Sequence, residues 1–591
     1  MNAVSDFIFS NQPIYKGVLS KAFNHIYSKL RPPIKEYHGN WGSLAVSQNV
    51  YKGFQPYEND KHITVVIGGP LLMFMENDYL TGQRLSYEGT KRIYERWLQG
   101  KMKWDEDLSG PFAVLIIDKE TNDFFCVTDP MSFIPLFQLQ AGEHIMLSTH
   151  VDALARAGKQ NQQVDEISVV DFILHGIVTY PYTFYRPIKQ MQPASIHYYK
   201  QNQIQSDYYW LPKEEFKYQS INEAALDLRE AITGYIDRIL KHTENIAQFI
   251  SGGEDSRTLA ALLSSVPDRK AFVFLEGMNR EGQTAQKAAE AYGADFQLVE
   301  RDKLHYLTIL PQCSDLVGSG AEYFHAHSYG FHEICKLDQY DAVFGGLFSD
   351  ALLKGARIRK LRGSDRFPFI PQVKMKTYSP TEKINNPMFN KEVLVKVQKR
   401  RKNHYEFLKT LRNESAEEWF EMWPSSQNFN IPNLHANRRL FPSYEPFMST
   451  QVVKISVAIP QSWKLNRRLF HRFAKPFLQK TKWLFHSEGR LPYFPWYINS
   501  IVQFGFWSYL QIGKLFGWIK GSQNPWVDWD ELMNSNKWKN TIIQYAHGMN
   551  TLMNVTEERD VVKFYNANSF NYLQRVNILQ VLYQLSCLKK N

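Results

Sequence analysis

Residues 249–257 read FISGGEDSR, and this stretch decides the fold of the central part of the chain. A short apolar run ends at Ile250, two glycines follow, and a helical pattern occupies residues 257–263. Two glycines in a turn allow a close approach of the backbone and dihedral angles that other residues disfavour. Because the N–H groups at a helix N-terminus attract negative charge, the turn predicts an anion site with Ser251 and Ser256 as additional donors.

The same turn carries an acidic residue, Asp255, which does not fit phosphate binding alone. A carboxylate beside phosphates indicates a bridging Mg²⁺ ion. The turn is not a Walker loop, because no Gly-Lys-Ser/Thr follows it. It is similar to Ser-Gly-Gly-x-Asp-Ser, the pyrophosphate loop of ATP pyrophosphatases. That similarity implies that Gly252 and Gly253, with the two serines, cradle the pyrophosphate of ATP while its α-phosphate is attacked.

Strands and helices alternate around this loop. The pattern predicts strands at 246–250, 271–275 and 296–299, with helices at 257–263 and 284–292 between them. Such alternation predicts a parallel sheet with helices on both faces. Beyond about residue 380 the chain is mainly helical.

The first 200 or so residues are rich in predicted strands instead. Apolar runs at 63–67, 112–117 and 124–127 are bounded by turn-forming residues, and the second and third are hairpin partners. A helix at 87–97 lies between strands. This half is therefore predicted to be an α+β layered domain.

Length and composition place the chain among ordinary globular proteins. Its 591 residues predict two or three domains, and the net charge of +10 is small for that length. No nucleic-acid-binding pattern occurs, so no nucleic-acid partner is expected. Four widely spaced cysteines form neither a disulfide framework nor a zinc site. The N-terminus has no signal-peptide pattern, so the cytoplasm is the expected location.

Residues 494–519 form an aromatic-rich segment that could be mistaken for a membrane span. It contains Asn499, Gln503 and Lys514 and falls short of the ~20 consecutive apolar residues of a membrane span. We expect a buried pair of helices here. The alternative is a surface that docks on a lipid membrane or a partner protein.

The chain resembles the asparagine synthetase family from near residue 40 to about 480. Residues 110–113 (GPFA), 127–130 (VTDP) and 135–137 (PLF) are similar to landmarks of its class II glutamine amidotransferase domain. In the second half, the phosphate loop, 343–350 (VFGGLFSD), 446–449 (PFMS) and 468–474 (RLFHRFA) are similar to synthetase motifs.

The resemblance implies three parts. Residues 1–210 would form a degenerate amidotransferase-like domain, an Ntn-type αββα sandwich. Residues 211–480 would form an α/β ATP-pyrophosphatase domain, with the parallel sheet of adenine nucleotide α-hydrolases. Residues 481–591 would be a helical, aromatic-rich extension.

Several positions depart from the family pattern. The glutaminase nucleophile is a cysteine exposed after removal of the initiator methionine, and this chain has Asn2 there. An amide cannot supply the thiolate that covalent catalysis on glutamine needs, so we expect no glutamine hydrolysis. Residues 67–70 (IGGP) stand where the family has a glutamine-binding Asn-Gly-Glu. Leu347 and Ala351 replace family acids.

Other roles follow from the resemblance alone. It implies that Asp255 and Asp350 hold Mg²⁺ on the phosphates, and that Leu275 and Gly346 lie against the adenosine. Arg468 would take the place of a family lysine and stabilise charge at the α-phosphate as pyrophosphate leaves.

Residues 318–327 lie where the family has its acceptor-carboxylate pocket. Within them, Glu322, His325 and His327 are candidates for the base that deprotonates the amine. The histidines could equally be metal ligands or residues that pack between elements.

These observations predict a ligase that uses ATP and Mg²⁺ to adenylate a carboxylate, releasing pyrophosphate, for attack by an amine. Macrolactam formation on a precursor peptide, as in lasso-peptide cyclases, is the sharpest version. Alternatives are amidation of a sugar acid in surface-polysaccharide synthesis, ammonia-dependent asparagine synthesis, and a nucleotide-binding pseudoenzyme or scaffold. The sequence does not indicate an oligomeric state.

Overall fold

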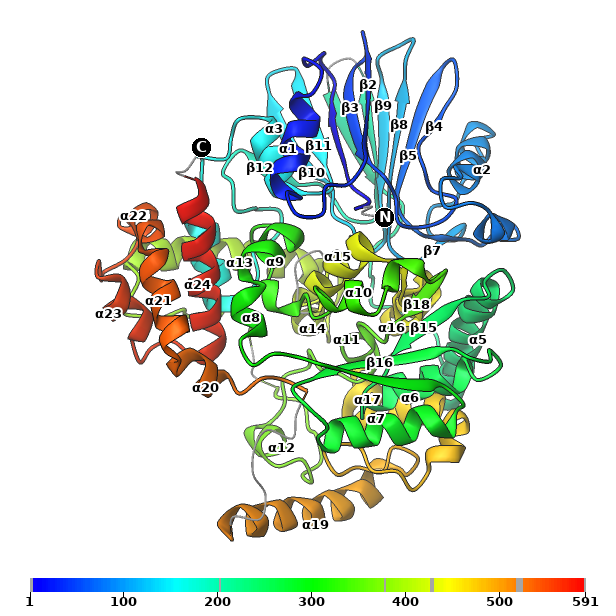
Figure 1. The fold of residues 1–591 in the computed structure, drawn as a ribbon, viewed down its shortest axis with the longest axis vertical. Coiled ribbons are helices and arrows are strands. Elements are labelled where there is room, and N and C mark those ends of the chain that lie inside the picture. The colour runs from blue at the N-terminus through cyan, green and yellow to red at the C-terminus, as the bar shows by residue number, and fades with distance from the viewer. Residues whose placement is uncertain (1–3, 201–202, 377–378, 426–429, 517–524, 589–591) are drawn as a thin grey trace.

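The N-terminal part of the computed structural model is a sandwich of two antiparallel six-stranded sheets (Figure 1). The structure describes residues 4–200, 203–376, 379–425, 430–516 and 525–588, so Asn2 lies outside it. The first sheet has the order β12 (Ile188–Gln190), β10 (Phe137–Ala141), β11 (His144–Ser148), β1 (Phe7–Ser10), β3 (Gly42–Ser47), β2 (Ile34–Gly39). The second has the order β14 (Gln203–Tyr208), β13 (Ser195–Lys200), β9 (Phe124–Thr128), β8 (Phe112–Asp118), β5 (His62–Gly68), β4 (Tyr57–Glu58).

Alternation along the strands creates the core of this sandwich. Phe7 and Phe9 of β1 pack between the sheets with Leu115 of β8, and Ile8 points to the opposite face. On that face lie helices α1 (Val18–Ile26) and α3 (Val151–Ala157), while α2 (Glu88–Leu98) covers the second sheet. The arrangement confirms the predicted αββα sandwich.

The second half is built on a five-stranded sheet in which every neighbouring pair is parallel. Its order is β17 (Asp295–Glu300), β16 (Lys270–Leu275), β15 (Ile246–Phe249), β18 (Ala342–Phe344), β19 (Ser443–Tyr444). The chain moves outward from β15 in one direction and from β18 in the other. The carboxyl ends of these two strands therefore form a topological switch point, where ligands bind in folds of this kind.

Helices pack on this sheet because their apolar residues lie on one face. In α5 (Ile221–Leu240) the buried residues include Leu228, Ile232 and Ile239, at helical spacing. The Ser220 hydroxyl caps this helix by accepting the Glu223 N–H. Helix α6 (Glu254–Leu262) follows β15, and α7 (Arg280–Ala291) follows β16. The α/β domain predicted from the alternating pattern is confirmed.

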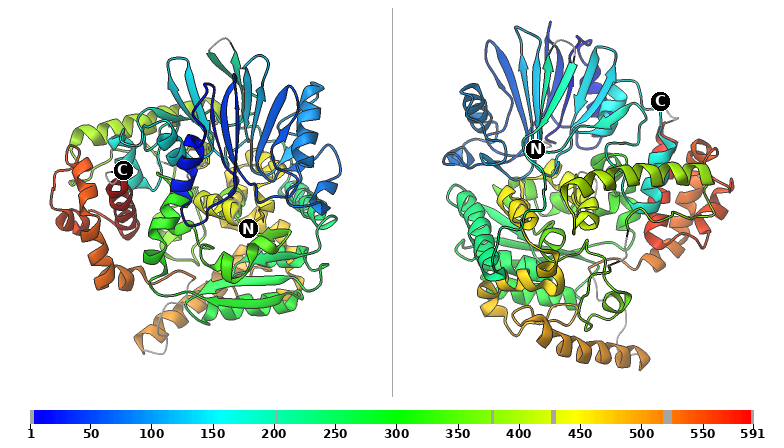
Figure 2. Two further views of the ribbon diagram at one scale, coloured as in Figure 1. Left: turned by 45° about the horizontal axis from the view of Figure 1, so that its top comes forward. Right: turned by 180° about the vertical axis from the view of Figure 1, so that it is seen from behind.

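The C-terminal part is helical and reaches back to the rest of the chain (Figure 2). Its last helix, α24 (Tyr572–Leu588), packs against α4 (Glu166–His175) of the N-terminal half. Gln574 donates a hydrogen bond to the Leu174 carbonyl at 3.0 Å, and Gln580 donates to the Ala321 carbonyl at 2.7 Å. Helix α24 thus contacts both halves.

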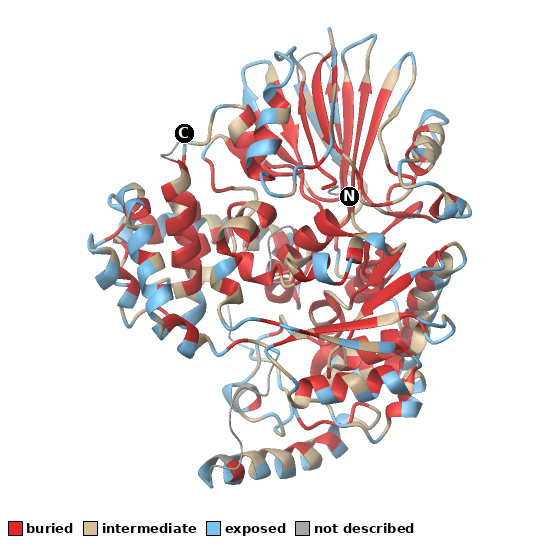
Figure 3. Cartoon of the chain, in the orientation of Figure 1, coloured by how far each residue is buried: buried red, intermediate tan, exposed pale blue. Residues whose placement is uncertain are grey.

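The prediction of a buried helix pair at 494–519 is wrong. One helix, α19 (Trp496–Leu515), lies along the outside of the molecule, where Ile501 is 76% and Leu515 82% exposed (Figure 3). Its polar residue Asn499 is buried instead, because it exchanges hydrogen bonds with the backbone of Leu491. Residues 517–519 lie outside the described residues. Among the helices that the structure describes, none combines the length and apolar character needed to cross a membrane.

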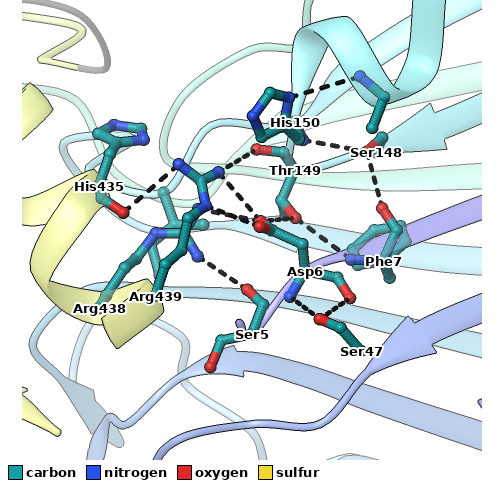
Figure 4. A network of polar contacts seen from close by, with 12 residues as sticks. Ser5, Asp6, Phe7, Ser47, Ser148, Thr149, His150, His435, Arg438 and Arg439 are labelled. Atoms are coloured by element: carbon teal, nitrogen blue, oxygen red, sulfur yellow. Dashed lines mark hydrogen bonds and ion pairs between the residues drawn. The ribbon is translucent and has the colours of Figure 1, made fainter. Parts of the chain in front are cut away.

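A buried ion cluster joins the two halves (Figure 4). The Asp6 carboxylate, fully buried beside β1, receives hydrogen bonds from Arg439 at 2.7 and 3.1 Å and from Arg438 at 3.1 Å. The Tyr27 and Thr149 hydroxyls also donate to it, at 2.5 and 2.7 Å. Burial alone would raise the pKa of Asp6, but the two arginines hold it far below its usual range.

We expect Asp6→Asn to lower the free energy of unfolding by about 3–5 kcal/mol, because it leaves two buried arginines facing a neutral group. Since the pKa of Asp6 is lowered by folding, its contribution is present above the ordinary aspartate pKa and is lost as the pH falls. The difference between wild type and variant should therefore narrow below about pH 4. Urea unfolding at neutral and acidic pH measures it, with the exposed-site variant Asp237→Asn as the control. Equal stability at neutral pH would contradict the role of this cluster.

Candidate functional site

The switch point between β15 and β18 gathers the motifs singled out in the sequence. The glycine turn 250–253 follows β15, and helix α6 begins at Glu254. Gly345 and Gly346 follow β18 directly. The two loops lie side by side, since a Cβ added to Gly346 would be 3.2 Å from the Cβ of Asp255. A larger residue at Gly346 would press on the turn.

The turn is held by side chains that bind its amides. The Ser251 N–H donates to the Ser256 hydroxyl at 3.0 Å, and the Gly253 N–H donates to the Ser251 hydroxyl at 3.1 Å. The Gly252 N–H donates to the carboxylate of Glu281, from α7, at 2.6 Å. The predicted residues are therefore brought together, and a carboxylate occupies one of the amide positions that an anion would use.

A cavity of about 330 Å³ opens beside the turn. One wall is apolar and aromatic, formed by Phe249 of β15 and residues 272–274 of β16. Ser251, Asp255 and Ser256 line the end nearest the turn. The size falls within the usual range for small-molecule sites, about 300–1,000 Å³.

Of the two residues predicted to lie against adenosine, the structure brings one to this cavity. Gly346 lines it together with Gly345. Leu275 is not among the lining residues and is buried beneath α7, where its Cδ1 would lie 3.0 Å from a Cβ added to Gly282. The neighbouring residues 272–274 form the wall in its place.

The lining of the cavity also contains polar residues that the sequence did not single out. Arg301, Asn437 and Glu445 line it. Glu445 is buried and accepts hydrogen bonds from the Leu347 N–H and the Ser443 hydroxyl, each at 2.9 Å. Burial raises the pKa of Glu445 to about 7, against the effect of these two donors.

Asp255 and Asp350 converge on one lysine. The Nζ of Lys354 lies 2.5 Å from Asp255 Oδ2 and 2.6 Å from Asp350 Oδ1. Asp350 lies in the first turn of helix α11 (Ser349–Leu353), and Lys354, four residues later, directly follows that helix. The two aspartates meet as predicted, but an ammonium lies between the carboxylates where Mg²⁺ was expected. The pair as arranged does not fit a divalent ion, and no group of three or more metal-ligating side chains exists among the described residues.

A third carboxylate, Glu254, belongs to the same cluster. It lies 2.5 Å from Arg467, 3.5 Å from Arg490 and 3.6 Å from Lys354. Burial alone would raise the pKa of Glu254, but these three cations lower it well below its usual range. Glu254, which occupies the variable position of the Ser-Gly-Gly-x-Asp-Ser motif, is therefore charged and paired with basic residues.

Arg468 does not reach the charged cluster, whereas the neighbouring arginine does. Arg468 is exposed at the start of α18 (Arg468–Ala474). Arg467 turns toward the cluster and lies 3.8 Å from Asp350. The cause is a left-handed backbone at Asn466 and Arg467, with φ of 55° and 56°.

The residues proposed as a base are only partly placed at the cavity. Glu322 lies 3.2 Å from His325 and accepts a hydrogen bond from Asn577 of α24 at 3.1 Å. Neither Glu322 nor His325 lines the cavity. His327 does, and it is 3.1 Å from the Tyr306 hydroxyl. Glu322 and His325 therefore lie outside this cavity, and for His325 packing between elements is an alternative that the sequence left open.

A second cavity, of about 490 Å³, lies against Glu254 and Arg467 and beneath α19. Its lining combines basic residues with aromatic residues of α19, among them Arg490, Trp496 and Trp507. The charged cluster thus borders one cavity through Asp255 and the other through Glu254.

Comparisons with known proteins agree with this architecture. The family model for a glutamine amidotransferase domain matches residues 41–210, and the model for asparagine synthase matches residues 227–487. The glutamine-hydrolyzing asparagine synthetase 3 of Bacillus subtilis is 23% identical over 170 residues, which cover 28% of each chain. A Mycobacterium tuberculosis protein, provisionally named as a glutamine-hydrolyzing asparagine synthetase, is 26% identical over 271 residues. This match covers 42% of the chain and 41% of that protein.

Among solved structures, glutamine phosphoribosylpyrophosphate amidotransferase from B. subtilis aligns at 10% identity over 50% of this chain and 75% of that chain. Its TM-score is 0.21, so the fold assignment rests on the topology described above. Sandwich, parallel sheet and glycine turn define an amidotransferase-type domain joined to an ATP-pyrophosphatase-type domain. The two family matches together span most of the chain, and the chain belongs to the asparagine synthetase family.

If ATP is the ligand of the turn, Arg467→Gln should weaken ATP binding by roughly tenfold or more, because Glu254 beside the turn loses its nearest cation and its charge then repels the phosphates. Arg468→Gln is the matched control, since it removes the same group one residue away on the exposed side. Isothermal calorimetry with both variants measures the difference. A larger loss for Arg468→Gln would show that the sequence-based assignment was right.

Proposed function

We propose that the chain is an ATP-dependent ligase that activates a carboxylate as an acyl-adenylate, releases pyrophosphate and transfers the acyl group to an amine. The glycine turn at the N-terminus of α6 carries this proposal, because it presents serine hydroxyls and helix amides beside a cavity with an aromatic wall. Helix N-termini of this kind favour phosphate groups.

In this proposal ATP lies across the first cavity. The adenosine packs against residues 272–274, and the phosphates point toward Ser251, Ser256 and the start of α6. Binding of phosphate at Gly252 requires the Glu281 carboxylate to leave its N–H group.

The first chemical step forms the adenylate. A carboxylate oxygen of the substrate attacks the α-phosphorus of ATP, and the bond from that phosphorus to the bridging oxygen of the β-phosphate breaks. Pyrophosphate leaves with the bonding electrons. We assign the stabilisation of the developing negative charge to Arg467 and Lys354, which pair with Glu254 and Asp255 at the start of α6.

The second step forms the amide. The amine nitrogen attacks the carbonyl carbon of the acyl-adenylate, AMP leaves, and the nitrogen loses a proton. Glu445 is the candidate base, because it lines the cavity and burial raises its pKa to about 7. A base with a pKa near the working pH is the most effective.

The carboxylate substrate is proposed to be larger than an amino acid, with macrolactam formation on a precursor peptide as the preferred case. The second cavity, about 490 Å³ and partly lined by aromatic residues, supports this preference. Amidation of a sugar acid and asparagine synthesis from ammonia remain the alternatives. A nucleotide-binding scaffold is the competing non-enzymatic function, and the carboxylate of Glu281 on the Gly252 N–H favours it.

We expect pyrophosphate release from ATP to depend on one class of carboxylate, measured with a coupled phosphate assay across peptide, sugar-acid and aspartate substrates.

Glu445→Gln should keep pyrophosphate release but lower amide formation by about 10²–10⁴-fold. In the wild type, amide formation should rise as the pH increases through about 7, because Glu445 must be deprotonated to act. The variant should lack that rise. ATP binding without pyrophosphate release on any substrate would favour the scaffold.

Glutamine should not serve as the nitrogen donor, because Asn2 cannot provide a thiolate. Incubation with glutamine, ATP and the carboxylate should release no glutamate above the buffer level, measured with glutamate dehydrogenase. The glutamine-hydrolyzing relative from B. subtilis is the positive control. Glutamate release at a comparable rate would contradict the expectation.

A further inference from the structure

Lys354 occupies an unusual position in the charged cluster. It follows α11, and its side chain is only 3% exposed. Its ammonium lies 4.7 Å from the ring centre of Phe470 and contacts both Asp255 and Asp350. These contacts, together with its burial, fix the ammonium between the two carboxylates that were predicted to bind a metal.

Basic side chains compensate the acids nearest this ammonium. Among the residues that the structure describes, Glu254, Asp255 and Asp350 pair with Lys354, Arg467 and Arg490, and the exposed Glu488 makes a further contact with Arg490 at 3.2 Å. A divalent ion entering between the aspartates would have to displace the ammonium. Each of the three carboxylates nearest the ammonium therefore already has a basic partner, which weakens its attraction for such an ion.

An ammonium differs from Mg²⁺ in what it offers to a phosphate. Mg²⁺ needs near-octahedral oxygen ligands at about 2.0–2.1 Å and keeps several water molecules. A lysine ammonium has three N–H donors. The two aspartates account for two of them, and Glu254 at 3.6 Å is beyond hydrogen-bonding distance. Lys354 lines neither cavity, so its charge acts on a ligand at the turn through its partner Asp255, which lines the first cavity.

We propose that the Lys354 ammonium takes the place of a divalent cation at this turn, so that the chain binds ATP without a metal ion held by Asp255 and Asp350. This inference rests on the proposed function, because it assigns the ligand of the turn as ATP. It changes the expected chemistry of the site: the two aspartates position a cation that belongs to the chain itself.

Calorimetry with ATP as the probe tests the proposal, in metal-free buffer with EDTA and in buffer with excess Mg²⁺. The wild-type dissociation constant should differ by less than about threefold between the two conditions. Lys354→Met should bind more than about tenfold more weakly in EDTA, because two unpaired carboxylates then repel the phosphates. Mg²⁺ should restore part of that binding, since the freed aspartates can hold it.

Lys464→Met is the matched control. Lys464 is also a buried lysine, 1% exposed, and pairs with Glu418 at 2.8 Å rather than with the acids at the turn. Its loss should leave the ratio of the two dissociation constants unchanged. Thermal unfolding of both variants checks that they fold. If a variant does not fold, the comparison of wild-type ATP binding in EDTA and in Mg²⁺ still tests the proposal.

Two outcomes would overturn the proposal in distinguishable ways. If the wild type binds ATP only with Mg²⁺, a metal ion rather than the Lys354 ammonium is the cation at the turn, and the proposed function stands. Absence of ATP binding in both buffers would remove the proposed function as well.

Discussion

The ion cluster of Asp6 with Arg438 and Arg439 is the contact on which the relation between the two halves depends. It joins β1 of the sandwich to helix α15 (Ile431–Leu440), and all three side chains are buried. The same helix carries Asn433 and Asn437, which line the first cavity. The N-terminal domain therefore supports one wall of the site whatever its own catalytic status.

This contact gives a physical reason for the chain to keep its amidotransferase-type domain, apart from any catalysis by that domain. Removing the domain would expose two buried arginines and free α15 on one side. Breaking a buried ion pair by removing one partner is strongly destabilising, because the remaining charge is left without compensation. The domain is thus part of the structure of the site.

Much of the fold follows from local patterns. The strands predicted at 246–250, 271–275 and 296–299 agree with β15, β16 and β17 to within a residue or two, because short buried runs flanked by turns and helices are distinctive. The glycine turn was also found from sequence. Its function depends on residues within a span of six, so spacing alone reveals it.

The remaining features depend on contacts that spacing does not encode. The left-handed backbone at Asn466 and Arg467 shifts the arginine at the turn by one residue, and a motif comparison cannot detect that shift. Glu281 reaches the turn from another helix, so only the packing reveals it. The contact between Lys354 and Asp350 could have been predicted from the sequence, since the two residues are four positions apart in a helical segment. For α19, the composition indicated burial of its apolar residues, but the buried positions include the polar Asn499, whose amide bonds to the preceding loop.

The position of α24 has a consequence for synthesis on the ribosome. Gln574 contacts Leu174, 400 positions earlier in the chain. The hydrogen bond between Asp6 and Arg438 joins residues over a similar separation, so it forms only after Arg438 has been synthesised. Contacts of such long range form slowly, and nascent domains that await them stay exposed meanwhile. The core next to α4 is completed only when α24 has left the ribosomal exit tunnel. If translation stops before α24, the apolar surface of α4 stays exposed and can be bound by chaperones.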